Sequence, residues 1–334
     1  MADVSERRQR VSATVLIAFG ANLLIAVAKS VAGAITGSAS MVAEAAHSWA
    51  DTGNEIFLMI AERRARRPQD VAHPLGFGRE AYVWSMFAAL GLFVAGSAVS
   101  IMHGIQSLVD PEPASNFGVA YVVFAIALVL EGTSFLQAYR QVNRAAKESG
   151  RDLFEQAIET SDPTLRAVFA EDLAAVVGIL IAFGGVLAHQ LTGSPIPDAV
   201  GSILVGILLG VVAIVLVDRN RRFLVGVEVP AAARARVLES LTSVPEISRV
   251  TQLHLEFVGP RQVYLVAAVD LLGDDTESHL GSRLRALERR IEASPGVVQA
   301  VLTIAEPSAP DLGPGHAPGP PRSERRTEPE VGAA

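Results

Sequence analysis

Residues 40 to 60 read SMVAEAAHSWADTGNEIFLMI, a run long and apolar enough to cross a bilayer that nevertheless carries ionisable side chains. His47 and Asp51 lie four residues apart, so a helix places them on one face with roughly 5–6 Å between their Cβ atoms. That spacing allows both side chains to bind one divalent cation. Because ionisable groups at membrane depth are costly, the run predicts a functional site inside a membrane helix.

The composition of the whole chain also indicates a membrane protein. Of its 334 residues 50% are hydrophobic and only 19% are charged, less than a soluble domain of this length would show. The net charge of −7 says little about partners, because it is divided between unlike regions. The chain has no cysteine, which excludes disulfides, iron–sulfur clusters and thiolate ligands. Nitrogen and oxygen ligands favour zinc, manganese, iron, cobalt or nickel over Cu(I).

Six apolar stretches are long enough to cross a bilayer as helices, and they are residues 13–34, 40–60, 82–108, 117–137, 165–191 and 196–217. Arginine and lysine precede the first stretch and follow the second, fourth and sixth. The three short alternate segments between stretches carry neither. By the positive-inside rule both termini are cytosolic. No cleavable signal pattern is present, and we expect residues 1–11 to be a short cytosolic tail before a transport domain at 12–222.

Beyond Arg222 the composition changes to that of a soluble domain, which we place at residues 223–306. The apolar patterns predict, in order, a helix from Pro230, two strands, a helix capped by Asp275 or Thr276, and a strand at 297–304. The predicted fold class is therefore an α-helical membrane protein with six transmembrane helices and a C-terminal cytosolic ferredoxin-like α+β (αββαβ) domain. The tail, residues 307–334, is rich in Pro, Gly, Arg and Glu, and we expect it to be disordered.

Ionisable residues in two of the predicted spans are the candidate ligands. The second span carries four at steps of three or four, which share one helical stripe: Glu44, His47, Asp51 and Glu55. The fifth span carries the pair Glu171 and Asp172. Facing helices would bring Asp172 against His47 and Asp51 in a site of three or four ligands near mid-membrane. Imidazole and carboxylates suit zinc and its neighbours. The alternative is a structural polar network between helices.

Several motifs of the chain resemble those of the cation diffusion facilitator family, the zinc transporter-type metal exporters. They are Ser38-Ala39-Ser40, His47-Ser48 with Asp51 and Asn54, the loop His73-Pro74-Leu75-Gly76-Phe77-Gly78-Arg79-Glu80, and Asp198. The resemblance covers residues 12 to 306. It implies antiport of a divalent metal against protons by a homodimer in the cell membrane, with a transport site built from the second and fifth spans. The metal is then the transported substrate, with no permanent cofactor.

One departure from the family pattern concerns the fifth span. Many zinc-exporting members have a histidine four residues before the aspartate, where this chain has Val168. His47, Asp51 and Asp172 carry over from the family, and Glu171 is an inferred substitute for the fourth ligand. Glu171 nevertheless points about 100° away from Asp172 around the helix. The chain thus resembles a divergent branch, whose carboxylate-richer site shifts the preference towards harder ions such as Mn²⁺.

Two further metal sites are weaker predictions. Asp70 and His73 match the spacing of a peripheral family site, but a further expected histidine is replaced by Phe77. We interpret that site as absent or weak, with His73 shaping the loop instead. In the cytosolic domain His254 and Glu256 share one strand face, and because histidines are sparse there we favour a solvated surface over a regulatory metal site.

The remaining polar residues of the spans have simpler interpretations. Asn22, Lys29 and Glu131 are expected to pack or to make polar contacts between helices, and Lys29 to extend towards an interface. His103 and His189 fall near helix ends, where a solvated histidine is the ordinary explanation.

Other functional classes fit less well than a transporter. A membrane metallohydrolase would carry a helical H-E-x-x-H motif, which the sequence lacks, so we expect no enzymatic activity. A metal-binding sensor or scaffold without transport is the alternative that stays open. The expected partners are lipid, divalent metal ions, protons and a second copy of the chain, and not nucleic acid.

Overall fold

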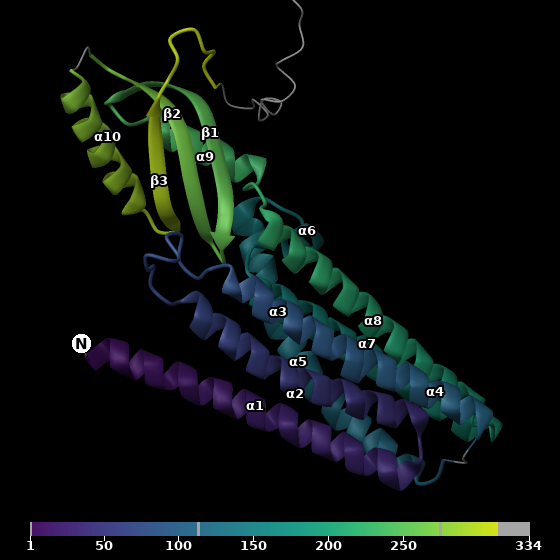
Figure 1. The fold of residues 1–334 in the computed structure, drawn as a ribbon. Helices are drawn as coiled ribbons and strands as arrows, with labels where there is room; N and C mark the ends of the chain where they lie inside the picture. Colours follow the sequence, from purple (N-terminus) through teal and green to yellow (C-terminus); the bar gives the residue numbers. More distant parts are fainter. Residues whose placement is uncertain (1, 112–113, 274–275, 313–334) are drawn as a thin grey trace, which may run out of the picture. The chain divides into compact units, whose positions relative to one another are not determined.

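The computed structural model describes residues 2–111, 114–273 and 276–312, which form two compact units. The first unit contains the long helices and ends at Val225 (Figure 1). Its elements are α1 (Ala2–Thr36), α2 (Ala39–Ala65), α3 (Glu80–Gly91), the π-helical segment η1 (Leu92–Ala98), α4 (Val99–Val109), α5 (Phe117–Ser149), α6 (Leu153–Glu159), α7 (Pro163–Thr192) and α8 (Ile196–Val225). The second unit contains the loop 69–76 and the chain from Gly226 onwards.

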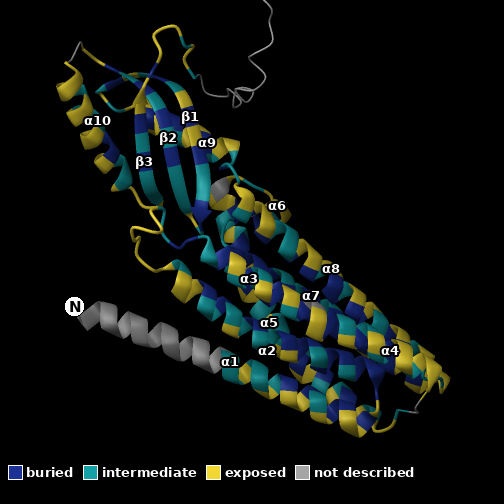
Figure 2. Cartoon of the chain, in the orientation of Figure 1, coloured by how far each residue is buried: buried dark blue, intermediate teal, exposed yellow. Residues whose placement is uncertain are grey.

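Within the described residues, five helical segments have the length and apolar composition to cross a membrane: α1, the continuous α3–η1–α4, α5, α7 and α8. These segments make the chain a multi-pass membrane protein. Figure 2 shows exposed bands along α8. The exposed apolar residues of this helix include Leu204, Ile207, Val211 and Ile214, a stripe that we expect to face lipid. The predicted second span is present as α2, but acidic residues interrupt its apolar run, so its crossing of the bilayer stays a prediction.

Several boundaries differ from the predicted spans. α1 begins at Ala2, so the predicted tail is helical where the structure describes it. α5 continues past residue 137 to Ser149, because the polar and basic residues that follow are themselves good helix formers. The third span is interrupted by η1, which the apolar run gave no reason to expect. The prediction lacked α6, since seven residues are too few to show a period.

The start of α2 is held by a carboxylate from another helix. Asp198, in the first turn of α8, accepts hydrogen bonds from the backbone N–H groups of Ala39 at 2.8 Å and Ser40 at 3.1 Å, and from the Ser38 hydroxyl at 2.9 Å. Negative charge is favourable at a helix N-terminus, where backbone N–H groups otherwise lack partners. The contact fixes the position, along and around its axis, of the helix that carries His47.

The second unit is a three-stranded sheet with two helices. Its elements are α9 (Ala231–Thr242), β1 (Ile247–Gly259), β2 (Gln262–Leu271), α10 (Glu277–Glu292) and β3 (Val297–Ile304). β2 lies between its neighbours, antiparallel to β1 and parallel to β3. Leu238, Leu255, Val269 and Leu287 belong to the core that joins helices and sheet. The element order is the predicted α-β-β-α-β, and the ferredoxin-like assignment stays a prediction.

The predicted disordered tail divides into two parts. Residues 313–334 lie outside the described residues. Before them, the chain lies beside β1, where Leu312 donates a backbone hydrogen bond of 2.9 Å to Val250 and the Arg249 guanidinium donates one of 3.0 Å to the carbonyl of Ala309. The cap predicted for α10 is at Thr276, and Asp275 also lies outside the described residues.

Candidate metal site

The helical stripe predicted on α2 brings His47 and Asp51 together. The His47 Nδ1 and Asp51 Oδ1 atoms are 3.4 Å apart, and the imidazole is fully buried. Neither ring nitrogen of His47 has a hydrogen-bond partner among the described residues, and the same holds for Asp51 Oδ1. Because buried polar atoms are normally satisfied, this pair has unused capacity to bind a cation.

The acidic pair of α7 is divided between two neighbouring helices. Glu171 is buried and accepts a hydrogen bond from the Asn54 side chain of α2. Asp172 accepts a hydrogen bond of 2.8 Å from Ser134 Oγ of α5. Successive residues of a helix point about 100° apart, and in this structure the two carboxylates contact different helices, Glu171 contacting α2 and Asp172 contacting α5. Of the two residues, Glu171 is the one that the structure brings into direct contact with the helix of His47.

The predicted ligands lie near one another without converging. Asp51 interacts electrostatically with both Glu171 and Asp172. Among the residues that the structure describes, however, no three His, Asp or Glu side chains are close enough to hold one metal ion. Glu171 Oε1 and Asn54 Oδ1 are buried and without hydrogen-bond partners in this region. A ligand set from α2 and α7 thus stays a prediction.

Polar contacts extend the candidate site along α2 in both directions. Asn22 of α1 donates a hydrogen bond of 2.6 Å to Glu55, one turn beyond Asp51. On the opposite side, Lys29 of α1 forms a fully buried ion pair of 2.9 Å with Glu44. The predicted polar contacts between helices are confirmed for Asn22 and Lys29, but the expected extension of Lys29 towards an interface is wrong. The sequence showed the acidic stripe on α2, but it did not show that Lys29 pairs with Glu44 of that stripe.

His189 is not the solvated residue that its place near a helix end indicates. It is 4% exposed, and its Nδ1 atom lies 3.9 Å from Asp198 Oδ2. The Phe117 ring meets its imidazole edge-on. The prediction was wrong because the first turns of α5 and α8 cover the end of α7.

In the loop between α2 and α3, Asp70 and His73 contact each other. The Asp70 carboxylate accepts hydrogen bonds from the His73 backbone at 2.7 Å and is 2.8 Å from the His73 imidazole, which lowers the pKa of Asp70. Phe77 instead contacts the Arg67 guanidinium, which lies 4.3 Å from the ring centre. These contacts support the interpretation that His73 shapes the loop.

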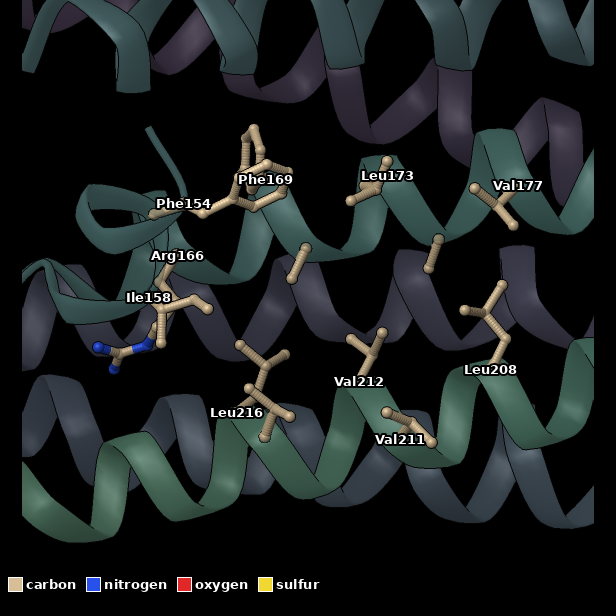
Figure 3. Close-up of a pocket in the computed structure, with 14 residues that line it drawn as sticks. Phe154, Ile158, Arg166, Phe169, Leu173, Val177, Leu208, Val211, Val212 and Leu216 are labelled. Carbon is tan, nitrogen blue, oxygen red and sulfur yellow. The ribbon is translucent and has the colours of Figure 1, made fainter. Parts of the chain in front are cut away.

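A pocket on another side of the first unit has a different character. It lies between α6, α7 and α8, and its lining is apolar except for Arg166 (Figure 3). Phe169, Leu173 and Leu216 are among the side chains that surround it, and none of the candidate ligands belongs to the lining. The pocket suits apolar groups such as lipid acyl chains, and not a metal cation.

Comparison with known proteins places this helical unit in a family. Residues 15–225 match the cation efflux transmembrane domain, and the chain belongs to the cation diffusion facilitator family. Metal tolerance protein C4 of Arabidopsis thaliana is 36% identical over 70% of this chain and 51% of its own length. The mitochondrial proton-coupled zinc antiporter SLC30A9 of Mus musculus is 34% identical over 78% of this chain and 46% of its own length.

A third relative has a lower sequence identity to this chain, but the match covers more of its length. Magnetosome protein MamM of Paramagnetospirillum magneticum is 26% identical over 73% of this chain and 72% of its own. In contrast, the chain spans about half the length of the Arabidopsis and mouse relatives. The family is one of transporters.

Proposed function

We propose that this protein exports divalent metal cations, with Zn²⁺ as the favoured substrate, in exchange for protons. The observation that carries the proposal is the buried pair of His47 and Asp51 on α2, whose nitrogen and oxygen atoms lack hydrogen-bond partners among the described residues. The same helix contacts the carboxylate of Glu171 on α7 through Asn54. Imidazole and carboxylate together suit zinc, while the extra carboxylates keep Mn²⁺, Fe²⁺, Co²⁺, Ni²⁺ and Cd²⁺ as candidates. The family and the names of two relatives, a metal tolerance protein and a zinc antiporter, support this proposal.

In this proposal α2 is a sixth membrane-crossing helix. Its 27 residues span about 40 Å, more than the ~30 Å hydrocarbon core of a bilayer. Two of its acidic residues have polar partners on α1, since Glu44 pairs with Lys29 and Glu55 accepts a hydrogen bond from Asn22. An even number of crossings places both termini on one side, and the arginine-rich segments assign that side to the cytosol.

The proposed ligands are His47, Asp51, Asp172 and Glu171. Glu171 points about 100° away from Asp172 around α7, but it stays a candidate ligand because its contact with Asn54 directs it towards α2. In the transport cycle the helices alternate between two orientations. These groups bind the metal in the first orientation, and in the second they expose it to the opposite side of the membrane. Protons then compete for the same groups, since a ligand must be deprotonated to bind metal.

A metal sensor or scaffold would use the same residues without moving the ion. Counterflow by the purified protein in proteoliposomes separates the two functions, because a sensor binds metal but exchanges none across the membrane. We expect labelled Zn²⁺ to accumulate against an internal pool, with Mn²⁺, Co²⁺, Ni²⁺ and Cd²⁺ competing to different extents. Binding without any counterflow would contradict the proposal. We further propose that the working unit is a homodimer in the cell membrane.

A further inference from the structure

The ion pair between Lys29 and Glu44 adjoins the proposed site without belonging to it. Both side chains are fully buried, and Lys29 Nζ lies 2.9 Å from Glu44 Oε2. Among the 28 basic residues of the chain only two are lysines, Lys29 and Lys147. A lysine offers a compact charge on a flexible stem, whereas arginine is suited to fixed, two-pronged contacts. The Lys29 ammonium is therefore a charge that can change its position on a flexible side chain.

The pair leaves half of the Glu44 carboxylate unused. Glu44 Oε1 is buried and has no hydrogen-bond partner among the described residues. The carboxylate reaches the backbone of α7 at Gly178, where an added Cβ atom would lie 2.6 Å from Oε1. Glycine at this position leaves space for the carboxylate oxygen that Lys29 does not bind. A buried carboxylate oxygen without a partner is costly, so Glu44 retains capacity to bind a cation.

The unused oxygen belongs to the same stripe as an unused imidazole. Glu44 and His47 lie three residues apart on α2, a separation that makes side chains neighbours on a helix. Neither His47 nitrogen has a hydrogen-bond partner among the described residues. From Asp51 towards Glu44 the stripe leads away from the arginine-rich end of α2. A cation moving from the proposed site in this direction therefore meets Glu44 next.

We infer that Glu44 and His47 form a second, outer station for the transported divalent cation, and that the Lys29 ammonium and the metal occupy Glu44 in turn. This inference rests on the proposed function. The outer station is displaced by roughly 5 Å along α2, because its midpoint lies about 3.5 residues from the midpoint of His47 and Asp51, at about 1.5 Å per residue. A metal shared between His47 and Glu44 displaces the ammonium, and its return expels the metal outwards. Lys29 thereby acts as a tethered competitor of the substrate.

The test measures Zn²⁺ binding by calorimetry and Zn²⁺ flux in proteoliposomes with the full-length protein. Lys29→Met removes the competing charge, so we expect binding to tighten by about tenfold and flux to fall. Lys29→Met combined with Glu44→Gln should return the affinity to near the wild-type value. Lys147→Met is the matched control, because Lys147 is exposed on α5 and should change neither quantity. Because the loss of any neighbouring positive charge tightens the binding of a dication, tighter binding supports the inference only together with the fall in flux.

A folded Lys29→Met protein whose Zn²⁺ affinity is unchanged or weaker overturns the inference. A second variant serves if that protein does not fold. Gly178→Ala keeps Lys29 but crowds Glu44, and it should lower flux while changing the affinity less than about twofold; wild-type flux in this variant also overturns the inference. Absence of flux in the wild-type protein contradicts the proposed function itself. The two failures are thus distinguishable.

Discussion

Glu171 of α7 accepts a hydrogen bond from Asn54 of α2. The contact joins the two helices that carry the proposed ligands, and it lies one turn from Asp51 on the same side of α2. The adjacent Asp172 is directed to α5 through Ser134 instead. The two neighbouring carboxylates therefore have different surroundings, and their contributions to metal binding are separable by experiment.

We expect Glu171→Gln to weaken Zn²⁺ binding by about 10–100-fold, because it removes the carboxylate that faces α2. Asp172→Asn should weaken binding less, since Asp172 has to leave Ser134 to reach the metal. Calorimetric titration of both purified variants measures the difference. Ser134→Ala is the control, and it should not weaken binding. Wild-type affinity in Glu171→Gln would show that Glu171 is not a ligand.

Asp198→Ala should destabilise the helical unit. The substitution leaves the backbone N–H groups of Ala39 and Ser40 buried without their acceptor, at a cost of about 1–3 kcal/mol. Asp218→Ala is the matched control, because Asp218 is 38% exposed and its ion pair with Arg221 contributes about 0–1 kcal/mol. Thermal unfolding in detergent compares them. Equal melting temperatures for both variants would argue against the cap.

Gly206→Ala should be destabilising even though alanine favours helices. The added Cβ atom would lie 2.6 Å from Ile101 Cγ1 and 2.9 Å from the Ser97 carbonyl oxygen, and overpacking of this kind costs about 1–3 kcal/mol. At Gly184 no atom lies within 4 Å of such a Cβ among the described residues. Gly184→Ala should therefore be neutral or stabilise by up to about 1 kcal/mol. A lower melting temperature for Gly184→Ala than for Gly206→Ala would contradict this packing.

Local patterns in the sequence were sufficient for much of this fold. The spacing of His47 and Asp51 placed both on one helical face, and alternation of apolar residues located β1 and β2. Apolar runs located the long helices but not their ends, because a helix continues into water for as long as its residues favour it. The polar end of α5 is one such case.

These local patterns did not predict contacts between segments that are distant in the sequence. Lys29 and Glu44 are each recognisable as polar residues in apolar runs, but their pairing depends on how α1 and α2 are rotated against each other. His189 was misassigned for the same reason, since Asp198 arrives from the next helix. The direction of Glu171 towards α2 likewise depends on the rotation of α7, which a period of 3.6 residues leaves undetermined.

The central claim is that His47 and Asp51 bind a dication and protons in turn. Its most direct test records Zn²⁺ uptake and internal pH together in proteoliposomes that contain the wild-type protein, His47→Ala or Asp51→Ala. The account predicts Zn²⁺-dependent proton flux in the wild-type protein and its loss in both variants. Proton flux of wild-type size in both variants would contradict the account.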